Sequence, residues 1–289
     1  MLALSLTFIW GVGGIFSFGQ TIFSGLAGYS YAVISLNLTG WLGTVLGLLG
    51  GVAIALLSSI LLGYFMFYSR VSRLSVSIIT LACTLILYDL FNGMADDQYQ
   101  IGQVAIGGFN GIQQVPTLLH LDTVPQYLTV VILSALVLGG LMSLRNCRLG
   151  RVFNALRLNE ARTELLGYDV RAVKRTGFAI GGAIAGLAGA LQTSWGNTVS
   201  PTVFGIEQVI LVIILVLVGG RSQLWGAFLG ATLIQSLSGF LGTVAQQATP
   251  LILGTTLVMI VLLLPGGIAP TFQQRWQWLS RSRYRPELP

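Results

Sequence analysis

Eight apolar runs dominate the chain, and most of them are long enough to cross a lipid bilayer as a helix. They cover residues 2–36, 41–68, 74–92, 125–144, 172–197, 203–220, 224–243 and 249–264. A helix needs about 20 apolar residues to span the hydrocarbon core. Only 8% of the residues are charged, whereas soluble domains carry about a quarter, so most of the protein surface must face lipid. The sequence therefore predicts an all-α, polytopic transmembrane bundle with about eight spans.

The first run is longer than one span requires, and Gly11, Gly13 and Gly14 interrupt it. Two structures fit it: one long helix, or a half-helix followed by a re-entrant turn and a second helix. No cleavable signal peptide is expected, because the start lacks a basic region and the run does not stop at signal-peptide length. The last run ends at a Pro-Gly-Gly sequence that begins at residue 265, which is a helix-terminating signal.

The basic residues define an orientation for the bundle. All 15 Lys and Arg residues follow the second, fourth, sixth and last runs, and the intervening loops have none. The longest intervening loop, residues 93–124, carries Asp96, Asp97 and Asp122 instead. By the positive-inside rule the basic loops are cytoplasmic. We therefore expect a transmembrane domain over residues 1–270 with both termini in the cytoplasm, and a cytoplasmic tail over 271–289.

Several other classes of protein are disfavoured. The net charge of +6 does not indicate nucleic-acid binding, because the basic residues flank apolar runs. One His and two Cys do not make a common metal cluster. Steps of two glycines four residues apart favour close helix packing in a membrane. These steps are Gly47–Gly51, Gly182–Gly186 and Gly226–Gly230.

The basic loop at about residues 145–175 carries the signals of a short, capped helix. Asn159 is a good N-cap residue, and Glu160 falls in the first turn, where the helix dipole favours a negative charge. Gly167 is suited to end the helix in a left-handed conformation. The predicted helix, Glu160–Leu166, has about two turns and a length of about 10 Å.

One face of this short helix is apolar, with Leu158, Ala161 and Leu165 at helical spacing. So short a helix is marginal alone and needs something to pack on. One interpretation is a solvated loop helix that lipid headgroups steady. The other is a docking helix that inserts into a cytoplasmic partner and receives force from it.

Five motifs along the chain resemble, in the same order, those of one transporter family. They are IWGVGGIFSFGQTIFSGLAGYSYAV near the start, GGFNGI at residues 107–112, RLGRVFNALRLNEARTELLGYDVRAVKRTGFAIGGAIAGLAGAL in the basic loop and the run after it, VLVGGRSQLWGAFLGA, and LLLPGGIAP. The chain resembles the permeases of branched-chain amino-acid ABC importers, in particular the M-type permease subunit of the high-affinity importer. Two positions depart from the family pattern: Gln20 replaces the usual His, and Ser222 replaces a Gly.

The resemblance implies a permease subunit of the bacterial cytoplasmic membrane that translocates leucine, isoleucine or valine. It implies three protein partners: a second, related permease in a heterodimer, cytoplasmic ATP-binding subunits, and an extracytoplasmic solute-binding protein. The lipid bilayer surrounds the permease itself. The coupling contact to the ATPase is expected at Asn159, Glu160, Ala161, Leu165 and Gly167. No cofactor is expected on this chain. The sequence lacks a Gly-x-x-x-x-Gly-Lys-Ser/Thr phosphate loop, so ATP is expected to be used by the partner subunits.

The sequence alone leaves other functions open. A urea or short-amide ABC permease is the nearest one. A membrane-embedded enzyme needs a nucleophile and a base in one site, and an ion channel needs a polar filter; neither is legible in the apolar runs. Candidate residues for the translocation path are Asp89 and Glu207, because carboxylates near the membrane are costly and so suggest function, and Gln20, whose amide can hydrogen-bond a polar solute. Further side chains able to hydrogen-bond a solute are Asn92, Asn110 and Gln208.

Overall fold

The computed structural model describes residues 1–69, 71–94, 99–220 and 223–244, together with the single residues 254, 255, 259 and 267. The predicted tail, the loop residues Asp96 and Asp97, and almost all of the predicted last run lie outside this part.

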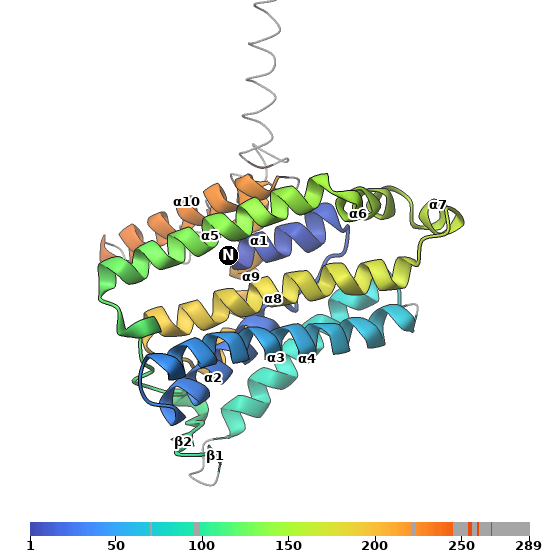
Figure 1. Cartoon of the computed structure of the whole chain (residues 1–289). Coiled ribbons are helices and arrows are strands. Elements are labelled where there is room, and N and C mark those ends of the chain that lie inside the picture. The colour runs from blue at the N-terminus through green and yellow to red at the C-terminus, as the bar shows by residue number, and fades with distance from the viewer. Residues whose placement is uncertain are drawn as a thin grey trace, which may run out of the picture.

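The described part is a bundle of helices (Figure 1). Its α-helices are α1 (Leu2–Thr7), α2 (Gln20–Asn37), α3 (Trp41–Tyr68), α4 (Arg73–Gly93), α5 (Thr123–Asn146), α6 (Arg148–Leu158), α7 (Glu160–Leu165), α8 (Val170–Gly196), α9 (Ile206–Gly219) and α10 (Leu224–Val244). A π-helix, η1 (Phe8–Val12), continues α1, and three 3-10 helices follow later: η2 (Gly108–Asn110), η3 (Leu118–His120) and η4 (Pro201–Phe204). The strands β1 (Gln100–Ile101) and β2 (Val104–Ala105) form an antiparallel hairpin, so the all-α prediction is right except for this small loop feature.

The apolar runs predict three long helices closely. Helices α3, α4 and α5 begin and end within two residues of the predicted runs, and each is long and apolar enough to cross a membrane. Helices α9 and α10 are bent by 117° relative to each other. Since α9 has 14 residues, it is about 21 Å long, which is less than the hydrocarbon core of about 30 Å. The described residues therefore show a multi-pass membrane fold, while the count of eight spans stays a prediction.

The structure selects between the two alternatives for the first run. Helix α1 and the π-helix η1 end at Val12, and α2 begins at Gln20. The turn between them passes through Gly14, whose φ of +69° lies in the left-handed region that favours glycine. The run is therefore a half-helix, a turn and a second helix.

Helices α2, α3 and α8 form the core, because small residues let their backbones approach closely. A Cβ atom on Gly51 would lie 2.7 Å from the carbonyl oxygen of Ala27, and one on Gly186 would lie 2.3 Å from a carbon of Ala55. Gly230 on α10 meets the backbone of Gly219 on α9 in the same way. The predicted glycine steps therefore pack helices together, as small residues do at helix contacts in membranes.

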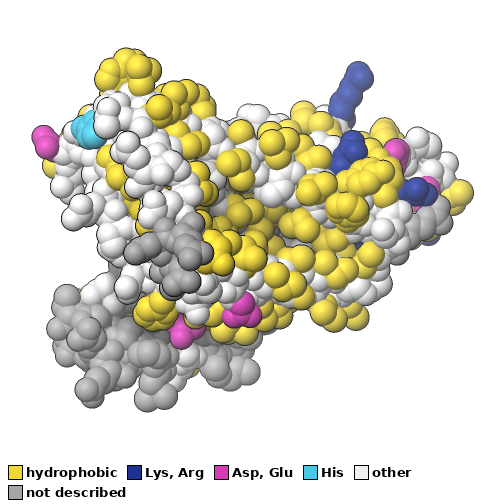
Figure 2. Space-filling model, turned by 90° about the horizontal axis from the view of Figure 1, so that it is seen from below, with side chains coloured by type: hydrophobic (Ala, Val, Ile, Leu, Met, Phe, Trp, Pro, Cys, Tyr) yellow, Lys and Arg dark blue, Asp and Glu magenta, His cyan; other side chains and the backbone are white. Residues whose placement is uncertain are grey.

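The two ends of the bundle differ in charge. Figure 2 shows Lys and Arg side chains gathered at one end and the His side chain at the other, with hydrophobic side chains over the length between them. Figure 1 places α7 at one end and the β1–β2 hairpin at the opposite end. Arg73, the first residue of α4, lies 3.6 Å from Glu160 of the 145–175 loop. The first two basic loops of the sequence therefore meet at one end of the fold, which we call the basic end.

Candidate functional site

The charged segment at the basic end folds into two helices, where the sequence analysis predicted one. The additional helix, α6, buries Gly150, Phe153 and Leu156 on one face. The ring of Phe153 packs edge-to-face on Phe8 of the π-helix η1, with ring centroids 5.8 Å apart. The buried residues of α6 lie three positions apart, and this helical spacing is the signal that the sequence analysis missed.

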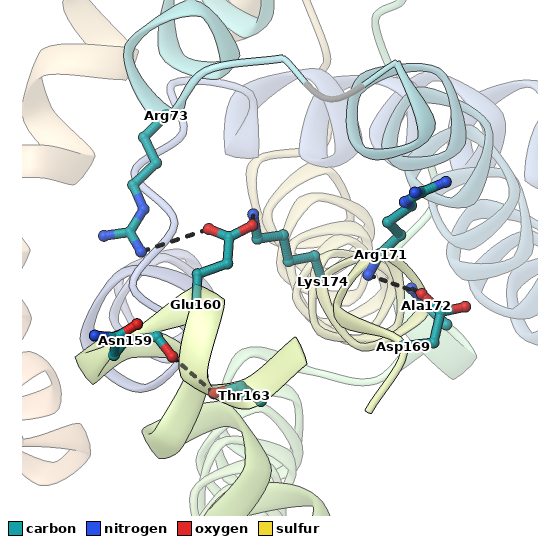
Figure 3. Close-up of polar contacts among 8 residues, drawn as sticks. All are labelled: Arg73, Asn159, Glu160, Thr163, Asp169, Arg171, Ala172 and Lys174. Atoms are coloured by element: carbon teal, nitrogen blue, oxygen red, sulfur yellow. Dashed lines mark hydrogen bonds and ion pairs between the residues drawn. The ribbon is translucent and has the colours of Figure 1, made fainter. Parts of the chain in front are cut away.

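Helix α7 forms as predicted, with both of its predicted terminal residues in place. The side chain of Asn159 accepts a hydrogen bond from the backbone N–H of Arg162, at 3.0 Å. The backbone carbonyl oxygen of Asn159 also accepts a hydrogen bond from the Thr163 hydroxyl, at 2.9 Å (Figure 3). Gly167 has a φ of +87°, and its N–H donates to the carbonyl of Glu164 at 2.9 Å. The helix ends at Leu165, one residue earlier than predicted.

Glu160 joins α7 to two other helices through its carboxylate. One oxygen contacts the ammonium group of Lys174 on α8, and the other lies 3.6 Å from the guanidinium of Arg73 on α4 (Figure 3). The Lys174 side chain is only 13% exposed, whereas that of Glu160 is 36% exposed. Exposed ion pairs contribute on the order of 1 kcal/mol or less. The contribution of this cluster is therefore mainly positional, since it fixes where the short helix lies.

Two further contacts fasten the segment, and the sequence analysis predicted neither. The guanidinium of Arg157 on α6 donates a hydrogen bond to the carbonyl of Gly11 in η1. The carboxylate of Asp169 accepts hydrogen bonds from the N–H groups of Arg171 and Ala172, at 3.0 and 3.2 Å, and so caps α8. The segment is thus connected to the first half-helix and to the start of the core helix α8.

The apolar face of α7 has no partner among the described residues. Leu158 is 80% exposed, Leu165 is 87% exposed and the adjacent Leu166 is 73% exposed. Ala161 is exposed as well, and of the residues of α7 only Thr163 is buried. We call Leu158, Ala161, Leu165 and Leu166 the exposed leucine face. Leucines held on a fixed helix at a charged end are typical of a protein-binding surface, because exposed apolar patches mark interaction sites.

The three residues predicted for the translocation path differ in burial. Gln20 is buried at the start of α2, where its Oε1 contacts the Ser5 hydroxyl, and its Nε2 has no partner among the described residues. Asp89 on α4 and Glu207 on α9 are exposed. None of the three lines the cavities described next.

Two of the cavities in the described part of the chain are lined by the second half of α8. The larger, about 700 Å³, lies between α1, α5, α8, α9 and α10. The smaller, about 160 Å³, lies between α2, α8, α9 and the loop after α8. Gln192 of α8 and Gln208 of α9 line both cavities. The sequence analysis named Gln208 among the polar side chains but not Gln192, because nothing local distinguishes that glutamine.

Comparison with known proteins gives one family over most of the chain. The family described as branched-chain amino acid transport system, permease component, matches residues 1–264. The high-affinity branched-chain amino acid transport system permease protein LivM of Escherichia coli (strain K12) is 27% identical over 300 residues, which cover 93% of this chain and 67% of that protein. LivM of Salmonella typhimurium gives the same identity and coverage.

A second kind of relative matches over a shorter part. The ribose import permease protein RbsC of Haemophilus influenzae is 29% identical over 126 residues, which cover 42% of this chain and 39% of that protein. No solved structure matches the chain.

The Glu160 cluster leads to a prediction about charge. Glu160→Lys places a third cation beside Arg73 and Lys174, so amide hydrogen exchange over residues 160–167 should become faster by about two- to fivefold. Adding Lys174→Glu restores an opposite-charge pair and should slow this exchange again. The measurement is hydrogen exchange detected by mass spectrometry on the purified protein in detergent.

The matched control for this prediction is Glu164→Lys, since Glu164 is exposed on the same helix and forms no ion pair among the described residues. Equal acceleration by Glu160→Lys and Glu164→Lys would show that the ion pairs do not hold α7.

Proposed function

The chain belongs to the permease family of branched-chain amino acid transport systems, and we propose that it translocates leucine, isoleucine and valine as one membrane subunit of an ATP-driven importer. Membership of this family supports a transport subunit that works with other subunits of a transporter, rather than an enzyme. The proposed location is the bacterial inner membrane, with the basic end and both termini in the cytoplasm, because basic loops favour that side.

The proposed partners follow from what the chain carries. The sequence has no phosphate-binding loop of the Gly-x-x-x-x-Gly-Lys-Ser/Thr type, so ATP binding is assigned to separate cytoplasmic subunits. The proposed complex also contains a second, related permease and an extracytoplasmic binding protein that delivers the solute.

The observation that carries the coupling proposal is the exposed leucine face. Leu158 and Leu165 are at least 80% exposed, yet α7 is capped at Asn159 and held through Glu160. A rigidly held apolar surface loses little conformational entropy when a partner covers it. We therefore assign this face to contact with an ATP-binding subunit, at Asn159, Glu160, Ala161, Leu165 and Gly167.

Force on α7 has two routes into the bundle. Glu160 connects α7 to α4 and α8 through its ion pairs with Arg73 and Lys174. Arg157 connects α6 to η1 through its hydrogen bond to the carbonyl of Gly11. When the ATP-binding subunits close, displacement of α7 would bias these helices between two packings. In one packing the path opens outward and in the other inward, as in other transitions that a ligand drives between two states.

The solute is assigned from the extent of the similarity. The LivM proteins are similar over 93% of this chain, whereas the ribose permease of H. influenzae is similar over 42%. The longer similarity favours branched-chain amino acids over ribose. Urea and short amides remain the second candidate class from the sequence motifs.

The docking proposal is tested by changing the exposed leucine face. Leu165→Glu places a charge where the ATP-binding subunit would bury an apolar side chain. Burial of a leucine contributes about 1.5–3 kcal/mol, so co-purification of that subunit should weaken tenfold or more. Gly167→Val forces a β-branched residue into a left-handed conformation, which costs at least about 1–2 kcal/mol. This variant should also weaken co-purification of the ATP-binding subunit.

The control for the docking test is Ile101→Glu, since Ile101 is also an exposed apolar residue but lies in the hairpin at the other end. That variant should retain the ATP-binding subunit. Normal co-purification and normal solute-stimulated ATP hydrolysis in both α7 variants, at normal permease levels, would leave α7 as a solvated loop helix.

The solute proposal is tested by deletion of the chain from its host. Uptake of radiolabelled leucine, isoleucine and valine at low concentration should fall to the background of other carriers, and expression of the chain should restore it. Ribose and urea uptake should be unchanged. If the deletion abolished ribose or urea uptake and left leucine uptake intact, the chain would instead be assigned to transport of that solute.

A further inference from the structure

Two cavities that meet at the same pair of glutamines suggest a place for the solute. Gln192 and Gln208 line both the cavity of about 700 Å³ and that of about 160 Å³. Gln192 lies four residues before the end of α8, and Gln208 lies in the first turn of α9. The pair therefore stands where the two cavities adjoin, close to the end of the bundle opposite the basic end.

The linings of these cavities have a distinct chemistry. Among the described lining residues there is no Asp, Glu, Lys or Arg. The larger cavity is lined mainly by apolar side chains, among them Leu191, Leu211, Val212 and Leu215, and its lining also contains Ser134 and Gln235. Half of the residues that line the smaller cavity carry small hydroxyl-bearing side chains: Ser24, Thr193, Thr198, Ser200 and Thr202. A solute that passes from the smaller to the larger cavity meets first hydroxyl groups, then two amides, then an apolar wall.

A primary amide suits a solute that carries both signs of charge. Each glutamine side chain offers two N–H donors and one carbonyl acceptor. Its donors can bind a carboxylate and its acceptor can bind an ammonium group, without the desolvation cost of a buried charge on the protein. A solute with one net charge would leave that charge uncompensated in such a lining.

We propose that Gln192 and Gln208 form the solute subsite of this chain, and that the subsite takes a small, net-neutral solute with one polar part and one apolar part. The two amides hold the polar part, and the leucine and valine side chains of the larger cavity cover the apolar part. This inference rests on the proposed transport function. It also predicts discrimination: a sugar has no apolar part for the larger cavity, and urea leaves that cavity empty.

The proposed subsite lies on the same helix as one of the residues that hold α7. Gln192 lies on the same continuous helix, α8, as Lys174, the partner of Glu160. Eighteen residues separate them along that helix, which corresponds to about 27 Å at 1.5 Å per residue. A shift of α8 that begins at its basic end therefore also moves Gln192 relative to Gln208 on α9.

The first measurement uses the complete importer in proteoliposomes, with its ATP-binding subunits and binding protein. Gln192→Leu and Gln208→Leu each remove one hydrogen-bonding group, so leucine uptake at low concentration should fall about five- to tenfold. Co-purification of the ATP-binding subunits should be unchanged. Gln103→Leu is the matched control, because Gln103 is an exposed glutamine in the β1–β2 hairpin loop and should transport normally. Leucine uptake at the wild-type rate by both Gln192→Leu and Gln208→Leu would contradict the proposed subsite.

The second measurement does not depend on turnover. In a chain whose Cys83 and Cys147 are replaced by serine, Gln208→Cys is labelled with a small thiol reagent in the same complete complex. Saturating leucine should slow this labelling at least threefold, and should leave the labelling rate of Gln103→Cys unchanged. Equal rates with and without leucine, in a complex that transports leucine, would also overturn the subsite.

These measurements separate the subsite from the proposed solute. If the wild-type complex carries ribose or urea but not leucine, the assignment to branched-chain amino acids and the amphipathic solute class are both wrong. Protection of Gln208→Cys by the solute that is carried would then still support the position of the subsite. Absence of protection by that solute would reject the position as well.

Discussion

The close approach of α2, α3 and α8 is the constraint on which the rest of the structure depends. Lipid is as apolar as a leucine side chain, so burial of apolar surface does little to bring helices together in a membrane, and packing has to do so. Glycines supply that packing here: a Cβ on Gly186 would lie 2.3 Å from a carbon of Ala55, and one on Gly189 would lie 1.9 Å from the carbonyl oxygen of Ser24. Any larger side chain at these positions would push α8 away from its neighbours.

Helix α8 connects the two functional regions because it is both long and tightly packed. Near its start, Asp169 caps the helix and Lys174 contacts Glu160 of α7. Near its end, Gln192 lines the two cavities. Because α8 is one continuous, closely packed helix, it would connect the proposed coupling helix α7 with the proposed subsite directly. The family's transport function thus has a physical counterpart in one element of the fold.

Much of this architecture follows from the sequence, where the signals are local. The limits of α3, α4 and α5 follow from apolar runs bounded by charged or turn-forming residues, and the ends of α7 follow from Asn159 and Gly167. The break in the first run required the structure, because the glycines at 11, 13 and 14 permit a bend but do not impose one.

The contacts that give the site its shape were not predictable, because they join residues far apart in the chain. Glu160 was assigned to the helix dipole and to a partner, yet its carboxylate is held by Arg73, 87 residues earlier, and by Lys174. Likewise Gln192 has no neighbour in sequence that identifies it, and only the fold places it on the same two cavities as Gln208. The exposed leucine face was predicted as apolar, and its exposure appears only once the fold is known.

The central claim is that the basic end, with α7 and its exposed leucine face, lies in the cytoplasm. Cys147 tests this most directly, because it is exposed at that end, between α5 and α6. A membrane-impermeant thiol reagent should label Cys147 in sealed inside-out vesicles and leave it unlabelled in sealed right-side-out vesicles, with Cys147→Ser as the blank. Labelling of Cys147 in right-side-out vesicles would place α7 outside the cell, out of reach of any ATP-binding subunit, and would contradict the account.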